Sequence, residues 1–269
     1  MDRFVNEKDY ALLDSDRYTF CVLSRILGGN NTLVLTDHDS MILCFSGEPF
    51  PVWIWNADDA SEEEYEKIYL LAKENGLTDG KHRFNIKYGL AEYFIRRAVA
   101  DGIEFSIETN MFAYDCPESI APSAGCDGSI HQCTADDIDE LVELMNLMHH
   151  AIDADYQSEE EYRKNAAAGV ERKGMYFWKN AAGKTVACCS WNGNGSGLAS
   201  INLVYTREEE RRKHYAGNLV FQVTEIVRKA GFLPMLYTDA DYVASNACYE
   251  KIGYVLRGKL CTIGSSAVS

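Results

Sequence analysis

The spacing of apolar residues divides the second half of the chain into a clear series of helices and strands. Thr134 is expected to cap a first helix, because Asp136 and Asp137 follow in its first turn and apolar residues then recur at helical spacing. A second helix is predicted over 159–170. The remaining predicted elements are strands at 175–178, 185–191 and 198–206, a loop at 192–197, a helix at 215–230, a strand at 233–238, a helix at 245–251 and a strand at 254–262.

The first half carries a weaker pattern with a similar order of elements. Ser61 can cap a helix that continues through three glutamates to Asn75. Because both halves place a strand meander before a helix, a strand, a helix and a strand, we expect a structural repeat, although no sequence motif repeats. The other predicted elements are helices at 10–27 and 90–100 and strands at 32–36, 41–45, 50–55, 82–88 and 104–114.

Pro, Gly and Ser residues gather between the two halves, in the segment 117–133. Such a composition is typical of a linker or a long loop. We therefore predict an N-terminal α/β domain over 1–116, a linker over 117–133 and a C-terminal domain over 134–269.

Charge and hydropathy narrow the classes of function. The 269 residues carry a formal net charge of −15, which repels phosphate backbones and anionic lipid headgroups, so neither nucleic acid nor a membrane is an expected partner. A cationic substrate such as an amine would be attracted. No stretch approaches the ~20 apolar residues that span a bilayer, and the first residues lack the apolar core of a signal peptide, so we expect a cytoplasmic protein.

Nine cysteines are scattered along the chain, and most are expected to be buried, reduced thiols. Cys116, Cys126, His131 and Cys133 are close enough in sequence to raise the question of a zinc site. Structural zinc sites usually contain a tight CxxC-type pair, which this group lacks, so no metal is expected.

A strand, a cation-rich loop and a helix follow one another over 201–218. Arg211, Arg212 and Lys213 stand where the predicted helix begins, beside unpaired backbone N–H groups that favour an anion. A pyrophosphate would fit this position. The alternative is an ordinary solvated helix start, in which these cations pair with the three glutamates of 208–210. This segment alone supports both interpretations equally.

Two motifs make the second half resemble the GNAT superfamily of N-acetyltransferases. The signature Arg/Gln-x-x-Gly-x-Gly/Ala follows a strand in that superfamily, and residues 211–216 match it except at the central glycine, which is His214 here. The second motif is an Asn before a Tyr, followed by an apolar residue, Gly and an aromatic residue, and residues 246–254 match it throughout. Residues 237–241 also look like the fifth strand of the superfamily and its exit. The resemblance extends over residues 130–262.

The resemblance implies an α/β (α+β) fold with a GNAT-like mixed, mostly antiparallel sheet flanked by helices. It places a GNAT acetyltransferase domain over 134–269 and a second, smaller, degenerate GNAT-like α/β domain at the N-terminus. It also implies that acetyl-CoA is the co-substrate and that no metal takes part. The residues implied in binding acetyl-CoA are Leu203, Val204, Tyr205, Thr206, Arg211, Arg212, Lys213, His214, Tyr215, Ala216, Gly217, Asn246 and Tyr249.

Each of these positions has an implied role. The strand 203–206 would hydrogen-bond to the pantetheine arm, the amides of 211–217 would hold the pyrophosphate, and Asn246 would hold the pantetheine or the phosphate arm. Tyr249 would protonate the departing CoA thiolate, because a phenol of pKa ~10 stays protonated at neutral pH. The backbone N–H of Val204 would stabilise the thioester oxygen. A packed aromatic residue on a short helix is the alternative for Tyr249.

His214 departs from the superfamily pattern at a position where glycine permits unusual dihedral angles. Histidine is expected to keep helical angles there and to weaken or alter CoA binding without abolishing it. The general base is not specified by the sequence. The candidates for the acceptor side are Glu171, Asp239 and Asp241 as bases and His149 and His150 as substrate contacts.

The sequence therefore predicts an acetyl-CoA-dependent N-acyltransferase that moves an acetyl group to a primary amine of a small molecule or peptide by direct attack. The N-terminal half would shape the acceptor side or a homodimer interface. The alternative is a non-catalytic, regulatory CoA-binding protein with the same fold. The presence of His214 in place of the superfamily glycine suggests this alternative.

Overall fold

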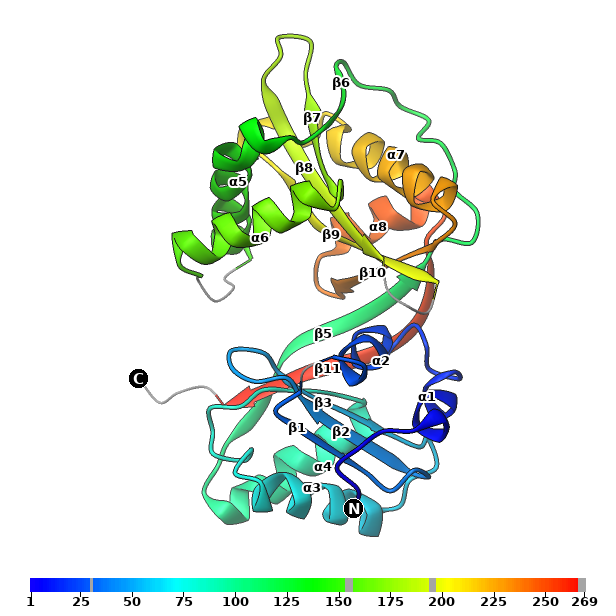
Figure 1. Cartoon of the computed structure of the whole chain (residues 1–269), viewed down its shortest axis with the longest axis vertical. Helices are drawn as coiled ribbons and strands as arrows, with labels where there is room; N and C mark the ends of the chain where they lie inside the picture. Colours follow the sequence, from blue (N-terminus) through cyan, green and yellow to red (C-terminus); the bar gives the residue numbers. More distant parts are fainter. Residues whose placement is uncertain (30, 153–156, 194–196, 266–269) are drawn as a thin grey trace. The chain divides into compact units, whose positions relative to one another are not determined.

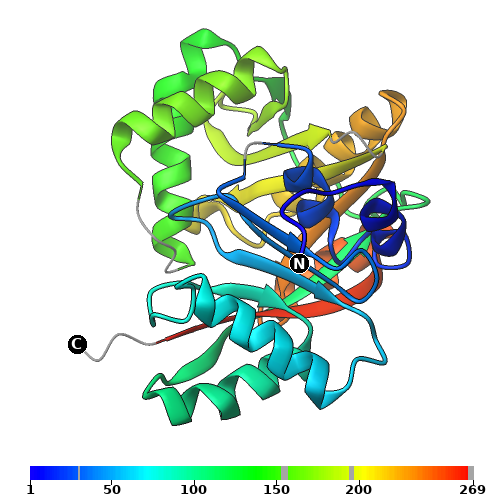
Figure 2. The same ribbon diagram turned by 60° about the horizontal axis from the view of Figure 1, so that its bottom comes forward.

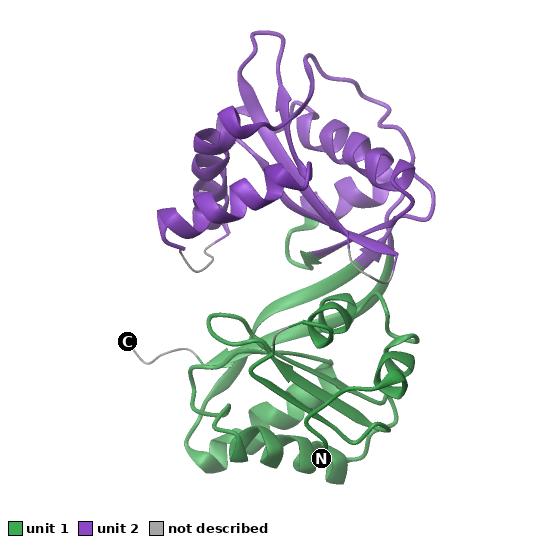
Figure 3. Ribbon diagram, viewed as in Figure 1, with its two compact units in different colours: residues 1–113, 238–243, 256–269 green, residues 114–237, 244–255 purple. Residues whose placement is uncertain are grey.

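The computed structural model describes residues 1–29, 31–152, 157–193 and 197–265 of the chain. The segments of two units alternate in the sequence (Figure 3). Unit 1 comprises residues 1–113, 238–243 and 256–269, and unit 2 comprises residues 114–237 and 244–255. The predicted domains are consecutive segments, whereas these units interleave.

Unit 1 is built on a mixed sheet with the strand order β1-β2-β3-β4-β11-β5. β1, β2 and β3 form an antiparallel meander, β4 runs parallel to β3, and β11 runs antiparallel to β4. Its elements are α1 (Glu7–Leu13), α2 (Cys21–Leu27), β1 (Leu33–Thr36), β2 (Met41–Phe45), β3 (Val52–Asn56), α3 (Glu62–Glu74), β4 (Phe84–Ile86), α4 (Tyr88–Ala98), the 3-10 helix η1 (Val99–Asp101), β5 (Phe105–Asp115) and β11 (Val255–Ser265).

Unit 2 is built on a sheet with the strand order β10-β9-β8-β7-β6. β6 to β9 are antiparallel neighbours, and β10 runs parallel to β9. Its elements are β6 (Ser129–Gln132), the 3-10 helix η2 (Ala135–Asp137), α5 (Ile138–Ala151), α6 (Glu159–Glu171), β7 (Met175–Lys179), β8 (Thr185–Gly193), β9 (Leu198–Thr206), the 3-10 helix η3 (Glu208–Glu210), α7 (Tyr215–Lys229), β10 (Leu233–Asp239) and α8 (Val243–Ile252).

The core of unit 1 lies between its sheet and the pair α3 and α4, which share one face (Figure 1; Figure 2). Phe94 of α4 packs edge-on against Tyr69 of α3 and Phe84 of β4, at centroid distances of 5.1 and 5.3 Å. Such aromatic contacts add to the free energy that burial of their area provides. On the other face, Phe20 packs against Trp53 of β3.

Unit 2 places α5 and α6 on one face of its sheet and α7 and α8 on the other (Figure 1). Leu141 and Leu144 of α5 are fully buried against Phe177 of β7 and Cys188 of β8. α7 is amphipathic and turns Leu219, Val220 and Val223 inwards. Alternate residues of the strands therefore meet different helices, which is the pattern expected for a sheet covered on both faces.

The predicted repeat is confirmed in its order of elements: two helices, three antiparallel strands, a helix, a parallel strand, a helix and a last strand occur twice. The mixed, mostly antiparallel sheet flanked by helices is confirmed as well. β11 is inserted between β4 and β5 in unit 1, although it ends the chain segment that the sequence assigned to the C-terminal domain. This long-range pairing leaves no local pattern in the sequence.

Two local predictions were wrong. The predicted helix 10–27 is two helices, α1 and α2, because the chain leaves the helix around Asp16. The carboxylate of Asp16 there accepts hydrogen bonds from Trp55 Nε1 and Lys87 Nζ at 2.8 and 2.6 Å, so tertiary contacts override helix propensity. Residues 192 and 193 of the predicted loop 192–197 continue β8 as a strand, whereas 194–196 lie outside the described residues. Residues 117–133 lie in unit 2 and contain β6.

None of the helices in the described part of the chain combines the length and the apolar character that a bilayer-spanning helix requires.

Candidate active site

A β-bulge interrupts β9 where the pantetheine arm was predicted to bind. Ser190 pairs with Asn202 and Cys188 with Tyr205, so the single residue Cys189 of β8 lies opposite two residues of β9. The first of these two, Leu203, has a φ of +51°, in the left-handed region. A bulge removes its extra residue from the hydrogen-bond ladder. The backbone of 203–204 is therefore the part of β9 least committed to β8.

The other edge of β9 opens towards the end of the strand. Its parallel pairing with β10 joins Leu198–Ser200 to Leu233–Met235 and does not extend to the later residues of β9. Extended ligands can add to such an edge through backbone hydrogen bonds. Leu203–Thr206, the predicted pantetheine-binding strand, lies in this stretch beyond the pairing.

The N-terminus of α7, which follows the loop after β9, has no side-chain cap. His214 occupies the N-cap position with φ 67° and ψ 7° and makes no capping hydrogen bond. The amides of Tyr215, Ala216 and Gly217 form the first turn, where N–H groups lack partners within the helix. Such a helix start favours an anion.

The expectation that His214 keeps helical angles was wrong. Its φ of +67° lies in the left-handed region that glycine adopts most readily, and Arg212 has a φ of +64°. The loop thus takes a conformation of the kind that the superfamily glycine permits, at a cost of about 1–2 kcal/mol for a residue with a Cβ atom.

The three cations of the loop are partly paired with neighbouring glutamates. Lys213 Nζ lies 2.7 Å from Glu210, and Arg211 Nη1 lies 3.6 Å from Glu208. Arg212 is exposed and makes no ion pair with any residue that the structure describes. The segment therefore has features of both interpretations. It contains the ion pairs expected of an ordinary solvated helix start, and it also has the uncapped helix start expected of a pyrophosphate site. Exposed ion pairs are weak, so a phosphate could displace them.

Two aromatic side chains predicted in the site point into the protein instead. Tyr205 is 9% exposed and packs in the core cluster beneath α5 and α6. Tyr215 is 5% exposed, and its hydroxyl donates to Asp127 Oδ1 at 2.5 Å. This hydrogen bond is the main reason why the pKa of Tyr215 rises to about 12. Only the backbone groups of these two residues remain available to a ligand.

α8 carries the second motif and packs close to the start of α7. Asn246 and Tyr249 are each 8% exposed. Burial raises the pKa of Tyr249, and the thiols of Cys189 and Cys248 raise it further. Cys189, which lies opposite the bulge, is therefore near enough to Tyr249 for its thiol to affect that pKa. A Cβ atom added to Gly217 would lie 3.4 Å from Cys248 Sγ, so α8 approaches the first turn of α7 closely.

One buried polar atom in this region lacks a partner. The side-chain oxygen of Thr206, the last residue of β9, is buried and makes no hydrogen bond to any described residue. Its backbone oxygen accepts a hydrogen bond from Arg211 Nε at 3.4 Å. The sequence predicted only backbone contacts at Thr206, and an isolated hydroxyl at a strand end gives no sequence signal. An orphaned hydroxyl, an open strand edge and an uncapped helix start fit an acyl-CoA with its amides and phosphates.

Comparison with known proteins agrees with this geometry. Residues 138–254 match the profile of the Acetyltransferase (GNAT) family. This segment is a GNAT acetyltransferase domain. The family generally uses acetyl-CoA, so domain and fold support an acetyltransferase. A search of curated proteins found no significant match to the sequence.

Solved structures of GNAT proteins match the fold along nearly the whole chain. A GCN5-related N-acetyltransferase from Sphaerobacter thermophilus has a TM-score of 0.70 at 10% identity and covers 98% of this chain and 95% of its own. A GNAT-family acetyltransferase from Colwellia psychrerythraea has a TM-score of 0.61 at 11% identity, with 98% of both chains covered. One from Kribbella flavida has a TM-score of 0.60 at 10% identity and covers 94% and 96%. The N-terminal half thus also matches GNAT folds.

The predicted acceptor-side residues come from several separate elements. His149 Nδ1 is 2.8 Å from the Tyr162 hydroxyl, a pairing of α5 with α6. His150 is exposed near the end of α5, and Glu171 is exposed at the end of α6. Asp239 and Asp241 belong to unit 1, where Asp239 accepts the backbone N–H of Asp241. The general base therefore stays unassigned.

The cysteines are free thiols, and seven of the nine are buried. Cys133 lies in the core beneath α5, whereas His131 Nε2 is bound to Asp137 at 2.9 Å. Within residues 1–29, 31–152, 157–193 and 197–265, no three His, Cys, Asp or Glu side chains are arranged to hold a metal ion.

Proposed function

We propose that the GNAT domain transfers the acetyl group of acetyl-CoA to a primary amine of a small molecule or peptide. The observation that carries this proposal is that unit 2 combines three features: the bulged strand β9, the uncapped start of α7 and the buried side chain of Tyr249. The amine nitrogen attacks the thioester carbonyl, a C–N bond forms, the C–S bond breaks and CoA leaves as its thiolate.

Backbone groups do most of the binding in this proposal. The edge of Leu203–Thr206 aligns the pantetheine arm as an added strand, and the N–H of Val204 at the bulge donates to the carbonyl oxygen as negative charge develops there. The amides of residues 211–217 receive the pyrophosphate together with Arg211 and Arg212. Asn246 holds the pantetheine or the phosphate arm.

Tyr249 supplies the proton for the leaving group. Its raised pKa keeps the phenol protonated at neutral pH, so the proton is present when the thiolate forms. The phenolate that results is strongly basic and takes a proton back from solvent. The ammonium form of the acceptor loses one proton before the neutral nitrogen attacks, and the nitrogen loses a second proton as the amide forms. Both protons pass to water or to a base that belongs to the acceptor side.

The acceptor is a cation before it reacts, and the net charge of −15 favours its approach. The absence of nucleic acid and membrane partners, a cytoplasmic location and a homodimer interface of the N-terminal half remain parts of this proposal.

An acetyl-transfer assay on the full chain tests the proposal. The purified protein is mixed with acetyl-CoA and a panel of primary amines and peptides with a free N-terminus. The release of free CoA thiol and the mass of the product are then measured. The expected result is a mass gain of one acetyl group on at least one amine. Binding of acetyl-CoA with no product across the panel would contradict it and favour a non-catalytic CoA-binding protein.

A further inference from the structure

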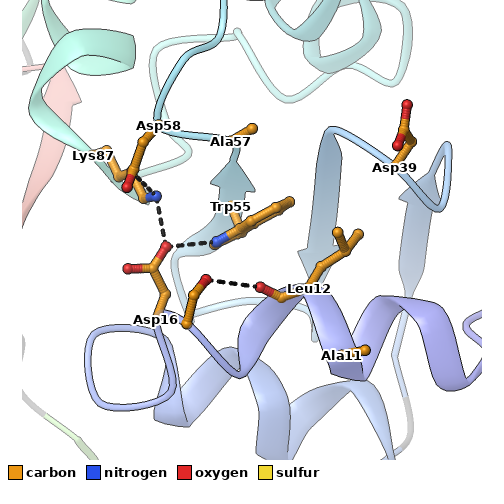
Figure 4. Close-up of a pocket in the computed structure, with 9 residues that line it drawn as sticks. Ala11, Leu12, Asp16, Asp39, Trp55, Ala57, Asp58 and Lys87 are labelled. Atoms are coloured by element: carbon orange, nitrogen blue, oxygen red, sulfur yellow. Dashed lines mark hydrogen bonds and ion pairs between the residues drawn. The ribbon is translucent and has the colours of Figure 1, made fainter.

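Unit 1 has a pocket at the place that corresponds to the proposed acyl-CoA site of unit 2. The pocket has a volume of about 320 Å³ and lies where the parallel strands β3 and β4 end (Figure 4). Ligands of open α/β sheets bind outside the carboxyl ends of parallel strands. Trp55 of β3, Asp58 of the following loop and Lys87 at the end of β4 line it, together with Asp16 and Asp39.

Anionic ligands do not fit this pocket. The loop and helix that follow β3 carry acidic residues instead of cations, and the N-terminus of α3 is already capped. Ser61 accepts the N–H of Glu64, and the Glu64 carboxylate accepts the N–H of Ser61 at 2.7 Å. At this helix start the amide of Glu64 is already bonded to Ser61, and the carboxylates of Asp58 and Asp59 would repel a pyrophosphate.

The side chain of Lys87 already brings one ammonium group to the wall of the pocket. Lys87 Nζ lies 2.6 Å from Asp16 and 2.5 Å from Asp58, and it lies 5.5 Å from the centroid of the Trp55 ring. The Trp55 indole N–H also donates to Asp16 at 2.8 Å, which holds the ring in place (Figure 4). Carboxylates beside an aromatic ring are the recognition elements for organic ammonium ions.

The charges of the lining residues are not balanced by Lys87 alone. The lining contains three carboxylates, of Asp16, Asp39 and Asp58, and one ammonium, that of Lys87, so its formal charge is −2. The Asp39 carboxylate makes no ion pair or hydrogen bond with any residue the structure describes and lies apart from Lys87 in the pocket (Figure 4). A second ammonium group therefore has a place at Asp39.

We infer that this pocket binds a small aliphatic amine in its ammonium form, with one ammonium at Asp39 and its alkyl chain along Trp55. The volume lies at the lower end of the ~300–1,000 Å³ typical of small-molecule sites, which suits a short linear amine. In this repeat the crevice at the strand ends is an amine site, whereas the proposed crevice of unit 2 takes the acyl donor.

Calorimetric titration of the full chain with 1,4-diaminobutane, in the absence of acetyl-CoA, tests the inference. Saturable binding at one diamine per chain is expected, with no binding of the uncharged 1,4-butanediol. Added salt should weaken the binding of the diamine. Since acetyl-CoA and turnover play no part, failure here is distinct from failure of the proposed function.

Asp39→Asn is the decisive variant, with Asp59→Asn as its matched control. Both side chains are exposed, and Asp59 does not line the pocket. Loss of the charge at Asp39 should weaken diamine binding about tenfold, whereas Asp59→Asn should leave it within about twofold. An absence of saturable binding, equal binding of the diol, or an unchanged affinity in Asp39→Asn would overturn the inference. Thermal unfolding of each variant checks that it remains folded.

Discussion

The chain makes the same strand-to-helix turn twice, from β3 into α3 and from β9 into α7, but the two helix starts differ. α3 is closed by the reciprocal hydrogen bonds of Ser61 and Glu64, and its first turn carries three glutamates. α7 begins at His214 without a side-chain cap and follows a loop that carries three cations. Of the two helix starts, only that of α7 therefore combines an uncapped first turn with nearby cations.

The strands before these helices, β3 and β9, also differ in regularity. β3 pairs with β2 without interruption from Trp53 to Asn56. β9 is bulged opposite Cys189, which frees backbone groups at 203–204. One repeat therefore has a regular strand and a capped helix, whereas the other combines the two irregularities on which the proposed acyl-CoA site depends.

The largest expected effect on turnover distinguishes α8, the helix after β10, from α4, the helix after β4. Tyr249→Phe should lower turnover about 100-fold, because the leaving thiolate loses its proton donor, with acetyl-CoA affinity nearly unchanged. Tyr93→Phe in α4 removes a hydroxyl that donates to Glu66 at 2.7 Å and should leave turnover unaltered. Steady-state kinetics and calorimetry measure both variants. Normal turnover in Tyr249→Phe would remove this residue from the mechanism.

The pH dependence of turnover also tests Tyr249 as the acid. An acid acts in its protonated form, which is lost as the pH rises through its pKa. Burial raises the pKa of Tyr249 above its ordinary value of 10.0, so ionisation of this residue should cause no loss of kcat up to about pH 9. A kcat profile between pH 7 and 10 checks this. An alkaline inflection below pH 9 that disappears in Tyr249→Phe would contradict it.

A smaller effect is expected at two histidines that share left-handed backbone angles. His38 in unit 1 lies between Asp9 and Asp2, at 2.7 and 2.9 Å, and His38→Gly should lower the urea midpoint because the buried Asp9 loses a partner. His214 makes no capping bond, and His214→Gly should stabilise the protein by about 0.5 kcal/mol through relief of backbone strain. Equal losses of stability in both variants would show that the strain at His214 is negligible.

Two threonines of unit 2 offer the finest contrast. The Thr206 hydroxyl is buried without a partner, so Thr206→Val should stabilise the ligand-free protein by about 1 kcal/mol. The Thr224 hydroxyl is 2.7 Å from that of Tyr254, so Thr224→Val should destabilise it. Urea unfolding measures both. Destabilisation by Thr206→Val as large as that by Thr224→Val would mean that the Thr206 hydroxyl is satisfied in solution.

Much of unit 2 could be predicted from the sequence, because its signals are local. The periodic apolar residues placed α7, and β9 was predicted with its observed bounds, Leu198–Thr206. The motif residues Asn246 and Tyr249 are brought to one helix, α8, beside the start of α7. Their roles in catalysis and binding remain predictions.

Other features depend on contacts that no local pattern records. The bulge at Leu203 has no glycine or proline to announce it, and the left-handed angles of His214 run against residue preference. The insertion of β11 beside β4 joins residues far apart in the chain, such as Cys261 and Ile86. The amine pocket likewise joins Asp16, Trp55 and Lys87 from three separate segments.

The central claim is that one acyl-CoA site exists per chain and that it lies at the start of α7. Calorimetric titration of acetyl-CoA tests it with wild type, Arg211→Ala/Arg212→Ala and the matched Glu62→Ala/Glu63→Ala variant of α3. We expect one site of micromolar affinity, about −8 kcal/mol, that is lost in the arginine variant and kept in the glutamate variant. No binding to wild type, two sites per chain, or full affinity in the arginine variant would contradict it.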